Sequence, residues 1–124
     1  MRIEKAAFVI AALAACLGAA GVAASAVAAH GGYDNNLKTA AQFALTHSVL
    51  VAALCLASGH RIPVALASAV ILLGALLFCG DLALRAVAGH SLFPMAAPTG
   101  GSMLIGGWLL LGVAALLALR EKPR

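Results

Sequence analysis

The most regular feature of the chain is an alternation of long apolar stretches with short polar ones. Apolar residues fill four stretches, at residues 6–29, 39–58, 64–84 and 100–119. The first carries no charged residue, and the third is interrupted only by Ser68 and Asp81. A bilayer core of about 30 Å needs roughly 20 apolar residues in a helix that rises about 1.5 Å per residue. The pattern therefore predicts four membrane-spanning α-helices.

The connections between these stretches decide how the helices are arranged. They are short, at residues 30–38, 59–63 and 85–99. Short connections make helices that are neighbours in sequence antiparallel neighbours in space. We therefore expect residues 1–124 to form a single transmembrane domain, an all-α four-helix bundle with up-down-up-down topology.

Composition supports a membrane protein and argues against a soluble one. Hydrophobic residues make up 64% of the chain and charged residues 10%, and the mean hydropathy is +1.06. A soluble domain usually has about 45–50% apolar and about 25% charged residues. The net charge of +4 does not indicate nucleic-acid binding, because the basic residues lie at the ends of apolar stretches, where they orient a protein in the membrane.

The distribution of Lys and Arg predicts the orientation. The side that holds both termini carries Arg2, Lys5, Arg61, Arg120, Lys122 and Arg124, whereas the other side carries Lys38 and Arg85. Cytoplasmic loops are the ones enriched in Lys and Arg, so both termini are expected in the cytoplasm. A cleaved signal peptide is the alternative for the first stretch, because residues 24–26 read Ala-Ser-Ala. The apolar run is, however, longer than the roughly 7–15 residues of a signal peptide.

Small residues are frequent in the predicted helices and indicate close helix packing, since helices in lipid associate through small-residue faces. The glycines expected to pack against neighbouring helices are Gly18, Gly21, Gly74, Gly80, Gly100, Gly101, Gly106, Gly107 and Gly112. The same faces could instead form a dimer interface, and the sequence does not separate the two readings.

The last loop and the fourth stretch resemble a known family. The motif consists of Pro98, Gly100, Gly101, Gly107 and Trp108, and it is similar to the signature of small four-span membrane proteins that include the bacterial YgdD-type and eukaryotic transmembrane protein 256-like proteins. Three further blocks match in order: Ala29-His30-Gly31, residues 43–47 and residues 74–80. The chain departs from the family pattern at Thr46 and Asp81. The resemblance implies the same four-span topology and no activity. We expect the chain to lie in a bacterial inner membrane.

Ionisable residues inside the predicted helices are the candidate functional groups, because such residues are costly in a membrane and often functional. The candidate polar site consists of His47, Asp81, His30 and Arg85. His47 would lie about 12 Å below the start of a helix that begins at residue 39. One reading is an Asp81–His47 pair that relays protons or binds ions, with His30 and His90 above it. The other is structural: Asp81 pairs with Arg85 at the i, i+4 spacing, and His47 bonds to a neighbouring helix.

Other chemistry has little support in the sequence. We expect no metal site and no cofactor, because the histidines and cysteines lack a ligand spacing such as C-x-x-C. Cys16, Cys55 and Cys79 lie in three different stretches and are interpreted as small apolar residues. Thr99 is expected to cap the fourth helix. The loop of residues 90–95 is unusually apolar, so it is expected to lie at the interface or to fold back onto the bundle.

Three classes of function are compatible with these patterns. The favoured one is a non-enzymatic accessory or scaffold protein that binds membrane lipids, other membrane proteins or itself. The alternative is a small oligomeric transporter or channel that uses His47 and Asp81. An enzyme is the weakest, because the chain shows no nucleophile with a matching base and no metal set.

Overall fold

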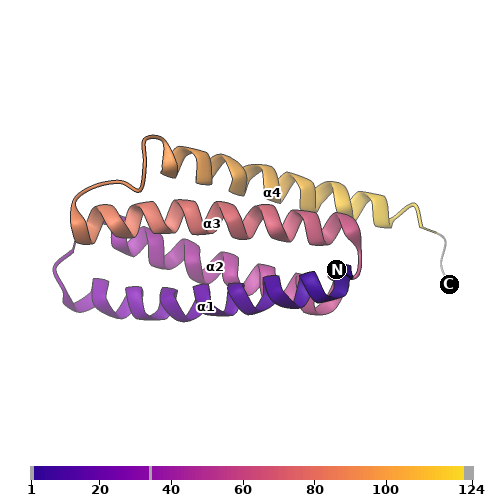
Figure 1. The fold of residues 1–124 in the computed structure, drawn as a ribbon, viewed down its shortest axis with the longest axis horizontal. Helices are drawn as coiled ribbons and strands as arrows, with labels where there is room; N and C mark the ends of the chain where they lie inside the picture. The colour runs from indigo at the N-terminus through magenta and orange to yellow at the C-terminus, as the bar shows by residue number, and fades with distance from the viewer. Residues whose placement is uncertain (1, 34, 122–124) are drawn as a thin grey trace.

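The computed structural model describes residues 2–33 and 35–121 and consists of four long α-helices (Figure 1). The helices are α1 (Ile3–His30), α2 (Asn35–Ser58), α3 (Ile62–Ala88) and α4 (Ala96–Ala118). Each is long and apolar enough to cross a membrane. The predicted all-α fold with four spans is confirmed. We call the end of the molecule where α1 begins and α4 ends the terminal end, and the opposite one the loop end.

The helices extend beyond the apolar stretches at several ends. α2 begins at Asn35, four residues before the apolar stretch, and α3 continues to Ala88. We expect polar residues at these ends to lie outside the hydrocarbon core, where a helix needs no apolar side chains. α4 begins at Ala96, so the prediction that Thr99 caps it is wrong. Met95, which has a φ of 69°, precedes the helix, and Pro98 fits its first turn because no N–H is needed there.

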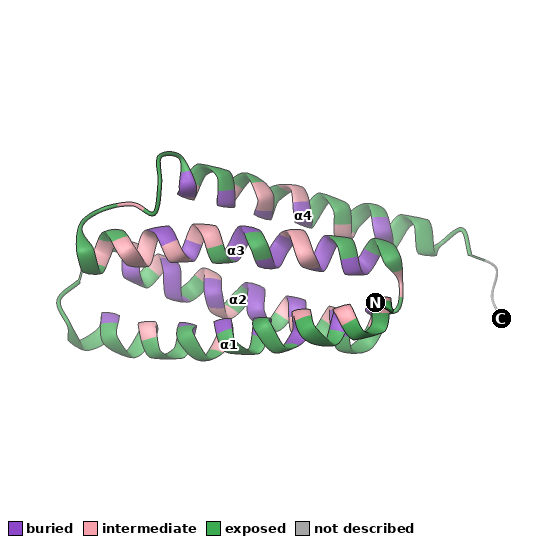
Figure 2. Ribbon diagram, viewed as in Figure 1, coloured by how far each residue is buried: buried purple, intermediate pink, exposed green. Residues whose placement is uncertain are grey.

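The helices pack in chain order. α1 packs on α2, α2 on α3 and α3 on α4, with a small contact between α1 and α3. No Cα atom of α4 lies within 8 Å of one in α1 or α2 over the described residues. Figure 1 shows α3 between α4 and the other two helices, and Figure 2 shows α4 exposed along most of its length. The bundle is therefore open, with α4 attached to the outside of α3.

Small residues form much of the core. Ala14, Ala67 and Ala75 are fully buried, and the largest fully buried apolar side chains are those of Ile71 and Val51. Small side chains bring helix backbones close together, and close van der Waals contact is what holds helices together in lipid.

The contact between α3 and α4 depends on three glycines. A Cβ atom added at Gly74 would lie 2.9 Å from the carbonyl oxygen of Gly100, and one added at Gly100 would lie 2.8 Å from the carbonyl oxygen of Gly74. A Cβ at Gly107 would overlap the side chain of Ile71. Real Cβ atoms do not approach backbone so closely, so the two helices can meet at this distance only with glycine at positions 74 and 100, while a side chain at position 107 would force Ile71 to shift.

The glycines of α1 face α2. A Cβ at Gly18 would lie 3.0 Å from Oγ of Ser48, and one at Gly21 would lie 3.0 Å from Cγ of Leu45. These are tight contacts against side chains, which can shift. The two glycines therefore permit the close approach of α1 and α2 but constrain it less than the α3–α4 glycines do.

Other glycines have more room. A Cβ at Gly80 or at Gly101 would make ordinary contacts, at 3.5 Å to the loop and 3.7 Å to Phe78 respectively. Gly106 and Gly112 have no atom within 4 Å of an added Cβ. The expectation that these two pack against a neighbouring helix of the same chain is wrong, because α4 is covered on one face only.

Candidate functional site

Asp81 is fully buried near the loop end of α3 and is bonded on both oxygens. Its Oδ2 accepts a hydrogen bond of 2.8 Å from Nε of Arg85, one turn further along the helix. Its Oδ1 accepts a hydrogen bond of 2.8 Å from the backbone N–H of Leu92. Asp81 is 0% exposed, and the Arg85 side chain is 44% exposed. The carboxylate therefore ties the loop between α3 and α4 to α3.

The loop that Asp81 binds folds back onto the bundle. Gly89 ends α3 with a φ of 77°, and its N–H donates to the carbonyl of Arg85. Leu92 then reaches back over Gly80, where its Cδ1 would lie 3.5 Å from an added Cβ. Phe93 remains exposed. The fold-back is thus made by the backbone N–H and the side chain of Leu92, while the side chain of Phe93 stays on the outside.

His47 lies at the centre of α2 and is 5% exposed. Its Nδ1 lies 2.7 Å from the carbonyl oxygen of Phe43, and the indole Nε1 of Trp108 lies 3.2 Å from its Nε2. An indole N–H is only a donor, so Nε2 must be the acceptor, and Nδ1–H donates to the carbonyl. The network assigns His47 as the neutral Nδ1–H tautomer. Among the described residues, the bond from Trp108 is the only side-chain hydrogen bond between α4 and α2.

Two aromatic rings contact His47. The Phe43 ring stacks on the imidazole at a centroid distance of 5.5 Å, and Trp108 meets it edge-on at 6.2 Å. Phe78 of α3 lies 4.9 Å from Phe43. Three helices therefore contribute to one cluster, which consists of Phe43, His47, Phe78 and Trp108. Trp108 is 47% exposed, so its ring covers the cluster on the outside while its N–H points inward.

The two candidate polar groups occupy different depths and have different partners. His47 lies about 18 Å from the start of α2 rather than 12 Å, because the helix begins at Asn35, four residues earlier than expected. Asp81 is seven residues from the end of α3, or about 10 Å deep. No hydrogen bond or ion pair in the described residues joins Asp81 to His47. His30 and His90 lie exposed at the loop end, and His90 contacts only Ser91 by hydrogen bond. The structure thus has two separate polar contacts, and both hold helices or loops in place.

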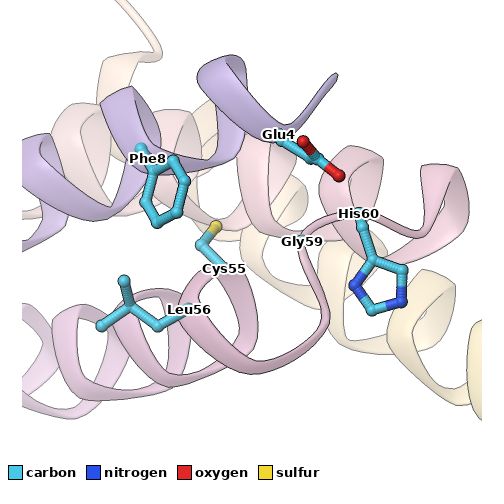
Figure 3. A pocket seen from close by; sticks show the side chains of 6 residues that line it. All are labelled: Glu4, Phe8, Cys55, Leu56, Gly59 and His60. Carbon is cyan, nitrogen blue, oxygen red and sulfur yellow. The ribbon is translucent and has the colours of Figure 1, made fainter. Parts of the chain in front are cut away.

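The terminal end has its own polar features. The Arg61 guanidinium donates two hydrogen bonds to the Glu121 carboxylate, at 2.9 and 2.6 Å. A nearby hollow of about 250 Å³ is lined by Glu4, Phe8, Cys55, Leu56, Gly59 and His60. Figure 3 shows the His60 ring turned away from the Cys55 thiol. No group of His, Cys, Asp and Glu within the described ranges is arranged to hold a metal ion.

The partner of His47 could not be read from the motif alone. The sequence pattern marks Trp108 only as a family residue, yet it lies twelve residues into α4, as His47 lies twelve residues into α2. Both helices start at the loop end, so the two residues share one depth. Because the two residues are equally far from the starts of two parallel helices, their equal depth is the sequence signal that could have pointed to this contact.

Comparison with known proteins gives one finding. The model of a family described as a protein of unknown function, DUF423, matches residues 17–101, more than half of the chain. Pro98, Gly100 and Gly101 lie within the matched residues, and Trp108 lies beyond them. No curated protein and no solved structure matches this chain. The resemblance seen in the sequence is therefore confirmed, and this multi-pass membrane protein belongs to the DUF423 family, the family of the YgdD-type and transmembrane protein 256-like proteins.

Proposed function

We propose that this protein is a non-enzymatic accessory or scaffold protein that binds other membrane helices, or a second copy of itself, through α4. The observation that supports the proposal is the poor cover of α4. In the most apolar 18 residues of α4 only 17% are buried, against 22% in α1, 39% in α2 and 44% in α3. α4 is held along one face by the glycines that meet α3, and its other faces are open to any partner in the membrane.

One open face of α4 has the character of a helix-packing surface. Ser102 is exposed and lies one turn before Gly106, which has nothing within 4 Å of an added Cβ. The Ser102 hydroxyl bonds to the carbonyl of Pro98 in its own helix. Two small residues at this spacing allow a second helix to approach closely, and this face is where we expect the partner.

The transporter alternative has less support. Both oxygens of Asp81 and both ring nitrogens of His47 already have partners within the chain. A site that moves protons or ions needs groups that can exchange partners with water or substrate. The two groups are therefore better explained as structural contacts.

We also propose that the protein lies in a bacterial inner membrane with both termini in the cytoplasm. The support is the charge distribution of the described residues, with Lys38 and Arg85 at the loop end and Arg2, Lys5, Arg61 and Arg120 at the terminal end. Cytoplasmic segments carry the excess of Lys and Arg.

The test is co-purification from membranes in a mild detergent, with wild type, Gly106→Leu and Gly112→Leu compared by mass spectrometry. Both glycines have open space around an added Cβ atom, so we expect both variants to fold, which circular dichroism checks, and they lie about 120° apart around the helix. We expect one stoichiometric partner, or a dimer, with wild type and Gly112→Leu, and its loss with Gly106→Leu. A chain that purifies alone and monomeric would contradict the proposal, as would ion flux in proteoliposomes that requires His47 and Asp81.

A further inference from the structure

A groove between α1 and α2 at the loop end has the chemistry of a lipid site. Its volume is about 400 Å³. Residues of α2 supply a cation, an amide and an apolar side chain, at Lys38, Gln42 and Leu45, while Ser25 and Ala29 line it from α1. We propose that this groove binds one phospholipid with an anionic headgroup, whose phosphate lies beside Lys38.

The residues that line the groove are arranged by depth in the same order as the headgroup, the glycerol esters and the acyl chains of a phospholipid. From the start of α2, Lys38 lies about 4–5 Å deep, Gln42 about 10 Å and Leu45 about 15 Å. A positive charge at headgroup depth meets the phosphate. An amide one turn deeper meets the glycerol esters, whose carbonyls accept hydrogen bonds. The apolar side chain below them meets the start of an acyl chain.

The polar groups of the groove are available for a ligand. Within the described residues no carboxylate lies within ion-pair distance of Lys38, and the side-chain amide of Gln42 has no hydrogen-bond partner. Only the backbone carbonyl of Gln42 is bonded, by the Thr46 hydroxyl at 2.9 Å. The other cation of the loop end, Arg85, is already paired with Asp81. Lys38 is therefore the better site for an added negative charge.

Small residues at the floor of the groove leave it open. Ala28 and Ala41 are buried there and have only a methyl group each. No side chain of the two helices fills the space, and an apolar hollow that faces lipid is filled by lipid. The site lies on α1 and α2, away from α4, so it does not depend on the proposed role of α4.

The test is native mass spectrometry of the full chain in detergent, titrated with dioleoyl phosphatidylglycerol and, separately, with dioleoyl phosphatidylcholine. We expect one phosphatidylglycerol to bind more tightly than phosphatidylcholine. Lys38→Gln should lower its binding constant about fivefold, which corresponds to ~1 kcal/mol for one basic residue at the membrane surface. Lys5→Gln, which removes an exposed charge at the terminal end, is the matched control and should have no effect.

A second pair of variants tests the groove itself. Ala29→Leu fills it from its exposed rim and should abolish tight binding, whereas Ala23→Leu adds the same bulk at an exposed position of α1 outside the groove and should not. Circular dichroism checks that all variants are folded. Equal losses in both members of either pair would overturn the proposal, because they indicate non-specific lipid association. Displacement of the lipid by millimolar inorganic phosphate would also overturn it, since the ligand would then be free phosphate.

Discussion

Replacement of Trp108 by Phe removes the indole N–H that donates to Nε2 of His47 and leaves most of the ring in place. The bond is 3.2 Å long and joins α4 to α2. Because Trp108 is 47% exposed, the smaller ring loses little packing within the protein. The main change is therefore the loss of a partner for a buried ring nitrogen.

The expected coupling free energy between Trp108 and His47 follows from the length of their hydrogen bond and from its buried position. Hydrogen bonds between membrane helices average about 0.6 kcal/mol and reach about 1.7 kcal/mol. At 3.2 Å this bond is at the long end of the usual range, but His47 is 5% exposed and lies too deep for water to replace the donor readily. We expect a coupling free energy of about 1 kcal/mol between the two side chains.

A double-mutant cycle measures this coupling. The free energies of unfolding of wild type, Trp108→Phe, His47→Phe and the double variant are compared in mixed micelles, with helicity as the signal. His47→Phe keeps a ring against Phe43 but removes both nitrogens. Independent sites add to within about 0.3–0.5 kcal/mol, so a coupling below about 0.3 kcal/mol would refute the assigned hydrogen bond. Nitrogen NMR of wild type should show the Nδ1–H tautomer, and the Nε2–H form would refute the same assignment.

Three further predictions rest on other contacts. Gly107→Ala should lower the free energy of unfolding by about 1–3 kcal/mol, because the new methyl group overlaps the Ile71 side chain of α3. Gly112→Ala is the control and should change the free energy of unfolding little, because this position has open space. Equal effects of the two variants would contradict the described packing of α4 on α3. Asp81→Ala should speed hydrogen exchange at the Leu92 amide, which loses its acceptor; unchanged exchange would show that the loop is held by something else. A reporter that is active only in the periplasm should be inactive at the C-terminus and active in the loop after α3, and the reverse pattern would contradict the proposed orientation.

The number and type of helices could be predicted from the sequence because lipid imposes both. An uninterrupted apolar run such as residues 6–29 has few alternatives to a spanning helix. The ends could not be predicted the same way. Asn35 and Ala88 lie in helices, but hydropathy stops being informative where the chain leaves the hydrocarbon core. The start of α4 is not predictable from capping residues because it depends on the backbone turn at Met95 rather than on a capping side chain.

In the candidate site, contacts between residues close in sequence could be predicted, and contacts between residues distant in sequence could not. The pairing of Asp81 with Arg85 follows from helix geometry, since residues four apart share a face. The bond from Leu92 to Asp81 requires the path of the loop, and the bond from Trp108 to His47 requires the rotation of two helices about their axes. Neither quantity is encoded in a local pattern, so the sequence leaves the structural and functional readings of these groups side by side.

The packing of the helices in chain order has a consequence for how the molecule is made. Each helix after α1 packs against the helix synthesised just before it, so assembly can proceed in the direction of synthesis without long-range searching. The charge of Asp81 acquires its partners within 11 residues of chain. His47, in contrast, gains its hydrogen-bond donor only when Trp108, 61 positions later, has been synthesised. The chemical environment of the His47 imidazole is therefore complete only after α4 has packed, so it can be used to follow that step.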